Sequence, residues 1–217
     1  GDNAFPAYEP DACPYQGGVV NGTGGDGCPL VIEDDEDLDS VVGYMIEQLG
    51  SVDVVIPNAG LGHFNPLNKG TMEEWRSMVD VNITGVLKTI HSCLPHLIES
   101  KGHLVNIGSL ASRQVFANSG VYCATKHAVE GFTKAFAIEW GKAKIRVNTI
   151  CPTFILTDLT KATFEQPQKR AWIEDKIKLG RVGEVEDIMG AVVYLASDAS
   201  ALVTGTALMI DGGWTAE

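Results

Sequence analysis

Apolar runs of strand length alternate with helix-length amphipathic segments along most of this chain, and no other feature restricts its fold as strongly. Three such runs occupy residues 52–56, 103–107 and 145–150, and each is short enough to be a buried strand. Between these runs, apolar residues recur at the spacing of one helix face. From residue 30 onward, the alternation predicts an α/β fold with a doubly wound parallel sheet and helices on both of its faces.

Two of the expected helices carry recognisable end signals. Thr71 and Glu74 form a capping box at the start of one helical stretch. Gly50 follows the apolar stripe of residues 38–49, where a glycine suits a helix C-terminal cap. Asn82 falls inside the helical stretch that begins after Thr71, although a short polar side chain is a poor helix former.

The segment from residue 153 to 180 is expected to be irregular, apart from a short helix around residues 168–177. Because this segment follows the carboxyl end of a strand, it is a candidate lid. Beyond it, residues 184–196 show helical apolar spacing and residues 206–210 form the last expected strand. A further short strand is expected at residues 30–32.

The composition argues against several classes of partner. The 217 residues carry a formal net charge of −12, whereas nucleic acids and anionic membranes attract clusters of Lys and Arg. No uninterrupted apolar stretch approaches about 20 residues, so we expect no membrane span. The five cysteines are widely spaced and form no Cys-x-x-Cys pair, which indicates a reducing, cytoplasmic setting and no structural metal site.

A candidate catalytic group lies close to the run at residues 103–107. Ser109 follows this strand, and the next helical pattern places Tyr122 and Lys126 four residues apart, on one helix face. In an open α/β sheet, ligands bind at the carboxyl edge of the strands, where these three residues would meet.

The chemistry of this trio suits a carbonyl group. A phenol has a pKa of about 10, and a nearby ammonium lowers that pKa. A serine hydroxyl can hold a carbonyl oxygen beside the phenol. Together the groups could protonate a ketone while hydride arrives, or catalyse the reverse reaction. The alternative is an amphipathic helix that carries Tyr122 and Lys126 by chance.

Residues 1–29 are rich in glycine and proline and lack a clear period. Residues 22–27 match the G-x-G-x-x-G spacing of dinucleotide-binding turns, which needs a strand before it and a helix after it. Cys28 and Pro29 follow directly and leave no room for that helix. An irregular Gly-rich segment is therefore the preferred interpretation.

Further along, the chain carries a series of motifs in a fixed order: Asn58-Ala59-Gly60, Asn82, Ser109, Tyr122-x-x-x-Lys126, Pro152-x-x-x-x-Thr157, Thr204-Gly205 and Asp211-Gly-Gly213. With these motifs the sequence resembles the short-chain dehydrogenase/reductase family, most closely its group of glucose 1-dehydrogenase-like and 3-oxoacyl reductase-like enzymes. The resemblance covers residues 30–217. It implies a single domain over residues 1–217, with a Rossmann-like sheet whose first β-α-β unit is atypical or incomplete.

The resemblance also implies a role for each catalytic candidate. Tyr122 would donate or accept the proton, and Ser109 would hold the substrate oxygen. Lys126 would bind the nicotinamide ribose and lower the pKa of the phenol. Asn82 would fix a water that links Lys126 to solvent.

The implied cofactor is NAD or NADP. The residues that would contact it are Asn58, Ala59, Gly60, Tyr122, Lys126, Pro152, Ile155 and Thr157. Taken alone, Thr157 reads as a helix cap, and the resemblance favours the cofactor role instead. Three positions depart from the family pattern: Val31 stands where an Asp that holds the adenine is expected, Pro57 where Asn is usual, and Thr153 where Gly usually follows Pro152.

The resemblance implies hydride transfer between the nicotinamide cofactor and a secondary alcohol or ketone. The alternative is a non-catalytic family member that keeps the fold and oligomer surfaces but has lost dinucleotide binding, because no family-like Gly-rich opening is visible. The acidic charge favours a small-molecule substrate over an acyl-carrier protein, which would need a basic surface. The family is commonly tetrameric, so a homotetramer is expected.

Overall fold

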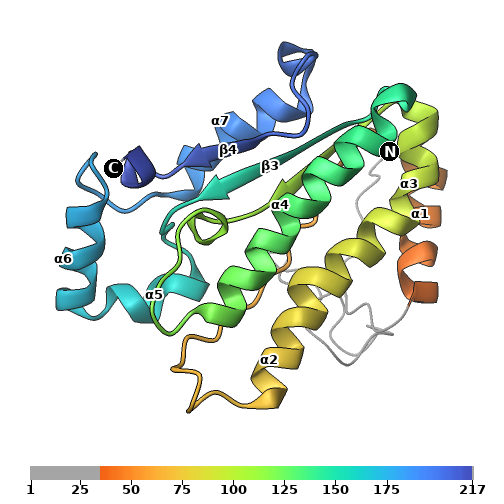
Figure 1. Cartoon of the computed structure of the whole chain (residues 1–217). Helices are drawn as coiled ribbons and strands as arrows, with labels where there is room; N and C mark the ends of the chain where they lie inside the picture. Colours follow the sequence, from red (N-terminus) through yellow and green to blue (C-terminus); the bar gives the residue numbers. More distant parts are fainter. Residues whose placement is uncertain (1–34, 217) are drawn as a thin grey trace, which may run out of the picture.

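The computed structural model describes residues 35–216, whose four strands form one parallel sheet (Figure 1). The strands, in sheet order, are β1 (Val54–Val55), β2 (His103–Ile107), β3 (Arg146–Pro152) and β4 (Ala207–Ile210). The sheet order follows the chain order. Because neighbouring strands are parallel, each is joined to the next by a crossover that contains at least one helix. The α/β, Rossmann-like parallel sheet predicted from the sequence is confirmed.

Helices occupy the connections between the strands. They are α1 (Asp35–Leu49), α2 (Met72–Val79), the π-helical η1 (Asp80–Gly85), α3 (Val86–Ser100), α4 (Gly120–Trp140), α5 (Asp158–Phe164), α6 (Pro167–Lys176) and α7 (Val185–Ala196). Short 3₁₀ turns are η2 (Leu110–Ser112), η3 (Gly141–Ala143), η4 (Asp198–Ser200) and η5 (Trp214–Ala216).

The predicted helix ends are confirmed. Thr71 Oγ1 accepts a hydrogen bond from the Glu74 amide at 3.2 Å, and a Glu74 carboxylate oxygen accepts one from the Thr71 amide at 2.8 Å. Gly50 follows α1 with a φ of 85°, a left-handed conformation that favours glycine.

Other expectations need correction. The strand expected over residues 52–56 has only two residues in β1, and α5 occupies part of the segment that was expected to be irregular. The strand expected at residues 30–32 and the Gly-rich match at 22–27 lie outside the described residues.

Helices cover both faces of the sheet because alternate strand residues point to opposite sides. Leu104 and Val147 pack against α1 and α3, with α4 at the edge of the same apolar cluster. Val105 and Ile150 pack on the other face, against Ala191 and Leu195 of α7. Figure 1 shows α3 and α4 lying side by side on one face, with α7 behind β3 and β4. This packing fixes the carboxyl ends of β1, β2 and β3 along one edge of the sheet.

Within the part of the chain that the structure describes, no helix is both long and apolar enough to cross a bilayer.

Candidate active site

Ser109, Tyr122 and Lys126 meet beyond the carboxyl end of β2, as their spacing predicts. Tyr122 and Lys126 lie on the first turns of α4, and the Lys126 Nζ is 6.0 Å from the centre of the Tyr122 ring. The side chain of Ser109 lies close enough to the Tyr122 phenol to lower its pKa. Lys126 is 7% exposed and its Nζ donates a hydrogen bond of 2.9 Å to the Ile107 carbonyl. The cluster therefore joins the end of β2 to the start of α4.

Burial governs the pKa values of Tyr122 and Lys126. It lowers the pKa of Lys126 to about 8, opposed by the nearby Cys151. Burial also raises the pKa of Tyr122, and the nearby Ser109 side chain offsets only part of that rise. The expectation that Lys126 gives the phenol a lowered pKa is wrong for this structure, because desolvation outweighs the other contributions. At neutral pH Tyr122 is therefore a protonated phenol, which is the form that can donate a proton.

Asn82 ties the loop after β1 to α4. Its Oδ1 accepts a hydrogen bond from the Leu61 amide at 2.8 Å, and its Nδ2 donates to the Leu61 carbonyl at 2.8 Å. The same Nδ2 donates to Thr125 Oγ1 at 3.1 Å, one residue before Lys126. Asn82 is 1% exposed and lies in η1, where the helix widens to a π-helix. Such widenings occur often at functional sites, because they redirect a side chain without ending the helix.

The backbone after β1 lies against this cluster. A Cβ at Gly60 would lie 3.6 Å from the Asn82 Oδ1 and 3.8 Å from the Lys126 Nζ, so the missing side chain leaves both groups accessible beside the backbone. Ala59 is half-buried, and Asn58 is exposed. These three predicted residues therefore lie at the same edge of the sheet as the catalytic candidates.

The segment after β3 carries the remaining predicted residues. Pro152 ends β3, Ile155 forms a parallel bridge with Gly183, and Thr157 is the N-terminal cap of α5. Thr153, which the sequence showed only as a departure from the family pattern, lies in the same segment. Its Oγ1 is buried and has no hydrogen-bond partner among residues 35–216.

A cavity of about 280 Å³ lies beside the start of α4. Its lining combines aromatic rings with amide and imidazole groups: His63, Asn65, Leu67, Trp75, Phe116, Asn118, Gly120 and Val121. Phe64, next to His63, packs edge-on against Tyr122 with 5.2 Å between ring centres. No sequence motif predicts this cavity, because its residues come from two separate connections, from β1 to β2 and from β2 to β3.

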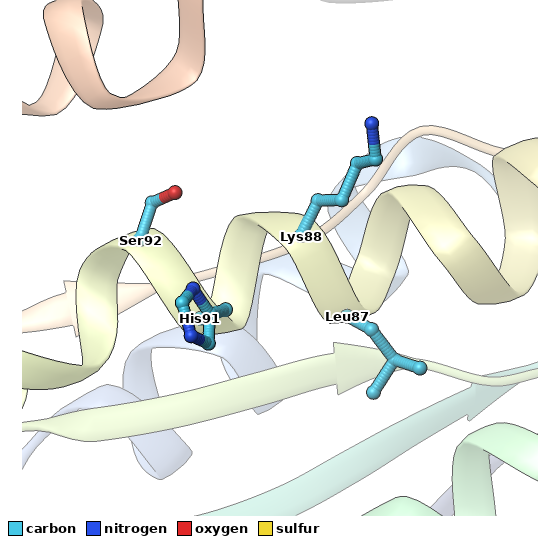
Figure 2. Close-up of a pocket in the computed structure, with 4 residues that line it drawn as sticks. All are labelled: Leu87, Lys88, His91 and Ser92. Carbon is cyan, nitrogen blue, oxygen red and sulfur yellow. The ribbon is translucent and has the colours of Figure 1, made fainter. Parts of the chain in front are cut away.

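A second hollow, of about 330 Å³, lies along α3 and is lined by Leu87, Lys88, His91 and Ser92 (Figure 2). None of these residues belongs to the predicted site. Among residues 35–216, no group of three or more His, Cys, Asp or Glu side chains is arranged to hold a metal ion.

Comparison with known proteins gives matches over most of the chain. A family model described as enoyl-(acyl carrier protein) reductase matches residues 19–215. D-erythrulose reductase from Gallus gallus is 36% identical over 167 residues, which are 76% of this chain and 68% of that protein. L-xylulose reductase from Bos taurus is 36% identical over 170 residues, which are 77% of this chain and 70% of that protein.

The fold has close structural counterparts as well. A crystal structure of gluconate 5-dehydrogenase from Burkholderia cenocepacia, in complex with NADP and tartrate, superposes with a TM-score of 0.83 at 28% identity. The match covers 87% of this chain and 75% of that one. Because sequence and structure agree over most of its length, the chain belongs to the short-chain dehydrogenase/reductase family.

Proposed function

We propose that this protein is an oxidoreductase that transfers a hydride between NAD or NADP and a secondary alcohol or ketone. One observation carries this proposal: the Tyr122 phenol, whose pKa burial raises and the Ser109 side chain lowers, lies next to the buried Lys126. The nicotinamide, when bound, would supply or accept the hydride.

In the reducing direction, Ser109 holds the carbonyl oxygen and Tyr122 donates its proton to that oxygen. The carbonyl carbon gains the hydride, so the product is a secondary alcohol and Tyr122 is left as a phenolate. The Lys126 ammonium stabilises this anion, because opposite charges interact strongly in a desolvated site. Asn82 holds Leu61 and Thr125 in place around Lys126 and would fix the water through which the proton is restored.

The described residues fit the nicotinamide end of such a cofactor. Lys126 uses one N–H on the Ile107 carbonyl, which leaves donors for the ribose hydroxyls. The Thr153 hydroxyl, buried without a partner within residues 35–216, suits the carboxamide. Pro152, Ile155 and Thr157 would flank that group, and the backbone at Asn58, Ala59 and Gly60 would line the adenosine side.

We further propose a small polyhydroxylated ketone or alcohol as the substrate. The cavity beside α4 offers the rings of Trp75 and Phe116 for the C–H faces of such a molecule. It also offers His63, Asn65 and Asn118 as hydrogen-bonding partners for hydroxyl groups. The relatives named for erythrulose and xylulose support this class.

A cytoplasmic homotetramer is the proposed form of the protein. Exposed apolar side chains on the two long helices support an assembly, among them Ile98 on α3 and Ile138 on α4.

An assay of purified protein with NADH or NADPH and a panel of small ketones tests the proposed function. We expect cofactor oxidation that matches alcohol formation mole for mole, with D-erythrulose or L-xylulose among the better substrates. Failure to turn over any ketone with either cofactor would contradict the proposal. Turnover of simple ketones without any gain from added hydroxyl groups would contradict only the substrate class.

A further inference from the structure

The turn that carries Ser109 is short, and its own hydrogen bonds join residues 109–114 to one another and not to α4. It consists of the three-residue η2 and the residues that flank it. The Ser112 amide donates to the Ser109 carbonyl at 2.9 Å, and the Ser109 amide donates to Ser112 Oγ at 3.1 Å. So short a turn does not fix its own position relative to α4, which carries Tyr122. Something outside it must set the distance between the serine and tyrosine hydroxyls.

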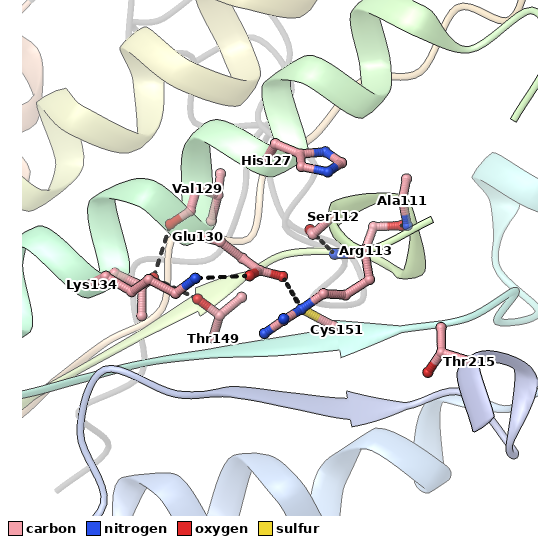
Figure 3. Close-up of polar contacts among 12 residues, drawn as sticks. Ala111, Ser112, Arg113, His127, Val129, Glu130, Lys134, Thr149, Cys151 and Thr215 are labelled. Carbon is pink, nitrogen blue, oxygen red and sulfur yellow. Dashed lines mark hydrogen bonds and ion pairs between the residues drawn. The ribbon is translucent and has the colours of Figure 1, made fainter. Parts of the chain in front are cut away.

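A buried carboxylate lies at the point where this turn, α4 and β3 meet. Glu130, two helical turns after Tyr122, is 5% exposed. Its Oε1 lies 3.0 Å from the Nε of Arg113, the residue that follows η2. The Cys151 thiol of β3 donates to the same oxygen at 3.8 Å, and the Lys134 Nζ lies 3.8 Å from Oε2 (Figure 3). One side chain therefore connects three elements of the site.

Gly108, just before the turn, packs closely against β3. A Cβ at Gly108 would come within 2.8 Å of the Cys151 sulfur and 3.1 Å of the Ser112 Oγ, so only glycine allows this approach. Burial raises the pKa of Cys151 to about 11, so its thiol stays neutral and acts as a hydrogen-bond donor. Cys151 thus packs against the turn at Gly108, and Arg113 links the turn to Glu130 of α4.

We propose that Glu130 and Arg113 are positioning residues whose ion pair holds the Ser109 turn against α4 and so sets the geometry between Ser109 and Tyr122. A buried carboxylate requires a partner, and the Arg113 guanidinium supplies the opposite charge at ion-pair distance. Catalysis is sensitive to such positioning, because a displacement of about 1 Å can cost about 100-fold in rate.

The chain offers a matched control in Lys134. Lys134 pairs with the same carboxylate from one turn further along α4, whereas Arg113 belongs to the Ser109 turn. If Glu130 only stabilises the helix, loss of either cation should have similar effects. If Glu130 anchors the turn, loss of Arg113 should loosen residues 109–114 and loss of Lys134 should not.

The first experiment measures hydrogen exchange of the backbone amides of residues 109–114 by mass spectrometry. We compare the parent with Glu130→Gln, Arg113→Met, Arg113→Lys and Lys134→Met. Glu130→Gln and Arg113→Met should exchange about 10-fold faster or more in this segment, Arg113→Lys should lie in between, and Lys134→Met should match the parent. Exchange at the parental rate in both Glu130→Gln and Arg113→Met overturns the proposal, as does equal loosening in Lys134→Met.

The second experiment measures the steady-state reduction of L-xylulose by NADPH or NADH with the same variants, and it rests on the proposed function. Glu130→Gln and Arg113→Met should lower kcat about 10-fold while the KM for the cofactor changes less than about two-fold, and Lys134→Met should retain parental values. An unchanged kcat in both variants overturns the claim that the ion pair sets the geometry between Ser109 and Tyr122. If the parent itself reduces no ketone, the proposed function fails, and the exchange data alone decide whether the ion pair holds the turn.

Discussion

The buried ammonium of Lys126 makes the folded protein less stable, although the proposed reaction uses its charge. This ammonium is almost fully buried next to an apolar sheet, and no carboxylate accounts for its pKa, which burial lowers from 10.5 to about 8. A buried charge of this kind is retained when the reaction needs it, because the fold alone would be better served by an apolar side chain.

The lowered pKa gives a prediction with a defined sign. Between about pH 8 and the ordinary value of 10.5, the unfolded chain binds more protons at Lys126 than the folded chain does. The loss of stability caused by burying the Lys126 ammonium is therefore fully present below about pH 8. Stability recovers as the pH rises through this window. We expect Lys126→Met to be at least as stable as the parent at about pH 7, with an advantage that shrinks towards about pH 10.

Thermal unfolding at several pH values measures this effect, and Lys134→Met, which removes an exposed ammonium, is the control. A Lys126→Met protein that is less stable than the parent by the same amount at every pH would show that burial does not govern the site.

At the scale of elements, the long helix between β1 and β2 is divided by η1, and Asn82 lies within this π-helical segment. Its amide side chain satisfies both backbone groups of Leu61 and reaches Thr125. This arrangement holds the loop after β1 against α4, so that Gly60 lies beside Lys126. The π-helical turn and the loop thus form one structural unit of the site.

Asn82→Ala should therefore destabilise the protein by about 2–4 kcal/mol, because it leaves buried hydrogen-bonding groups without partners. Asn65→Ala is the matched control, since Asn65 makes one exposed hydrogen bond to Glu74, and its loss should cost less than about 0.5 kcal/mol. Urea unfolding measures both. Equal effects from the two variants would mean that Asn82 does not hold this unit together.

The elements that sequence could predict are those whose signals are local. The capping box at Thr71 and Glu74, the Gly50 cap and the apolar runs of β2 and β3 all depend on neighbouring residues, and the structure confirms them. The helix α5 was missed because its seven residues are too few to show a period. The π-helical widening was missed because it depends on partners of Asn82 that lie 21 and 43 residues away.

The same distinction applies to the site. The spacing of Tyr122 and Lys126 predicted that they share a helix face, and Ser109 was correctly expected at the end of β2. The direction of the Tyr122 pKa shift was predicted wrongly, because the sequence gives the charge of Lys126 but not the extent of burial. The Glu130 and Arg113 pair was missed, since a glutamate and an arginine 17 residues apart form no motif.

At the scale of the whole molecule, the crossovers place the carboxyl ends of the strands at one edge of the sheet. Parallel strands share their carboxyl ends, and the ends of β1, β2 and β3 bring Gly60, Ser109 and Pro152 to a common border. The helices on both faces hold this border in a fixed shape, so that a cofactor and a substrate can meet there (Figure 1).

Cofactor binding is the prediction that belongs to this scale, and it separates the enzyme from a non-catalytic relative of the same fold. A ligand that binds only the folded state raises the unfolding temperature, and at 100 times its Kd it adds about 2.7 kcal/mol. We expect NADPH or NADH at about 1 mM to raise the Tm by several degrees in a saturable way. No shift with either cofactor would favour the non-catalytic alternative.

The account as a whole depends on proton donation by the Tyr122 phenol, and the most direct measurement compares ketone reduction by the parent, Tyr122→Phe and the control Tyr194→Phe. We predict that Tyr122→Phe loses about 10²- to 10⁴-fold in kcat. It should keep the thermal shift produced by the cofactor, and Tyr194→Phe should retain parental activity. A Tyr122→Phe protein that reduces ketones as fast as the parent would contradict the account.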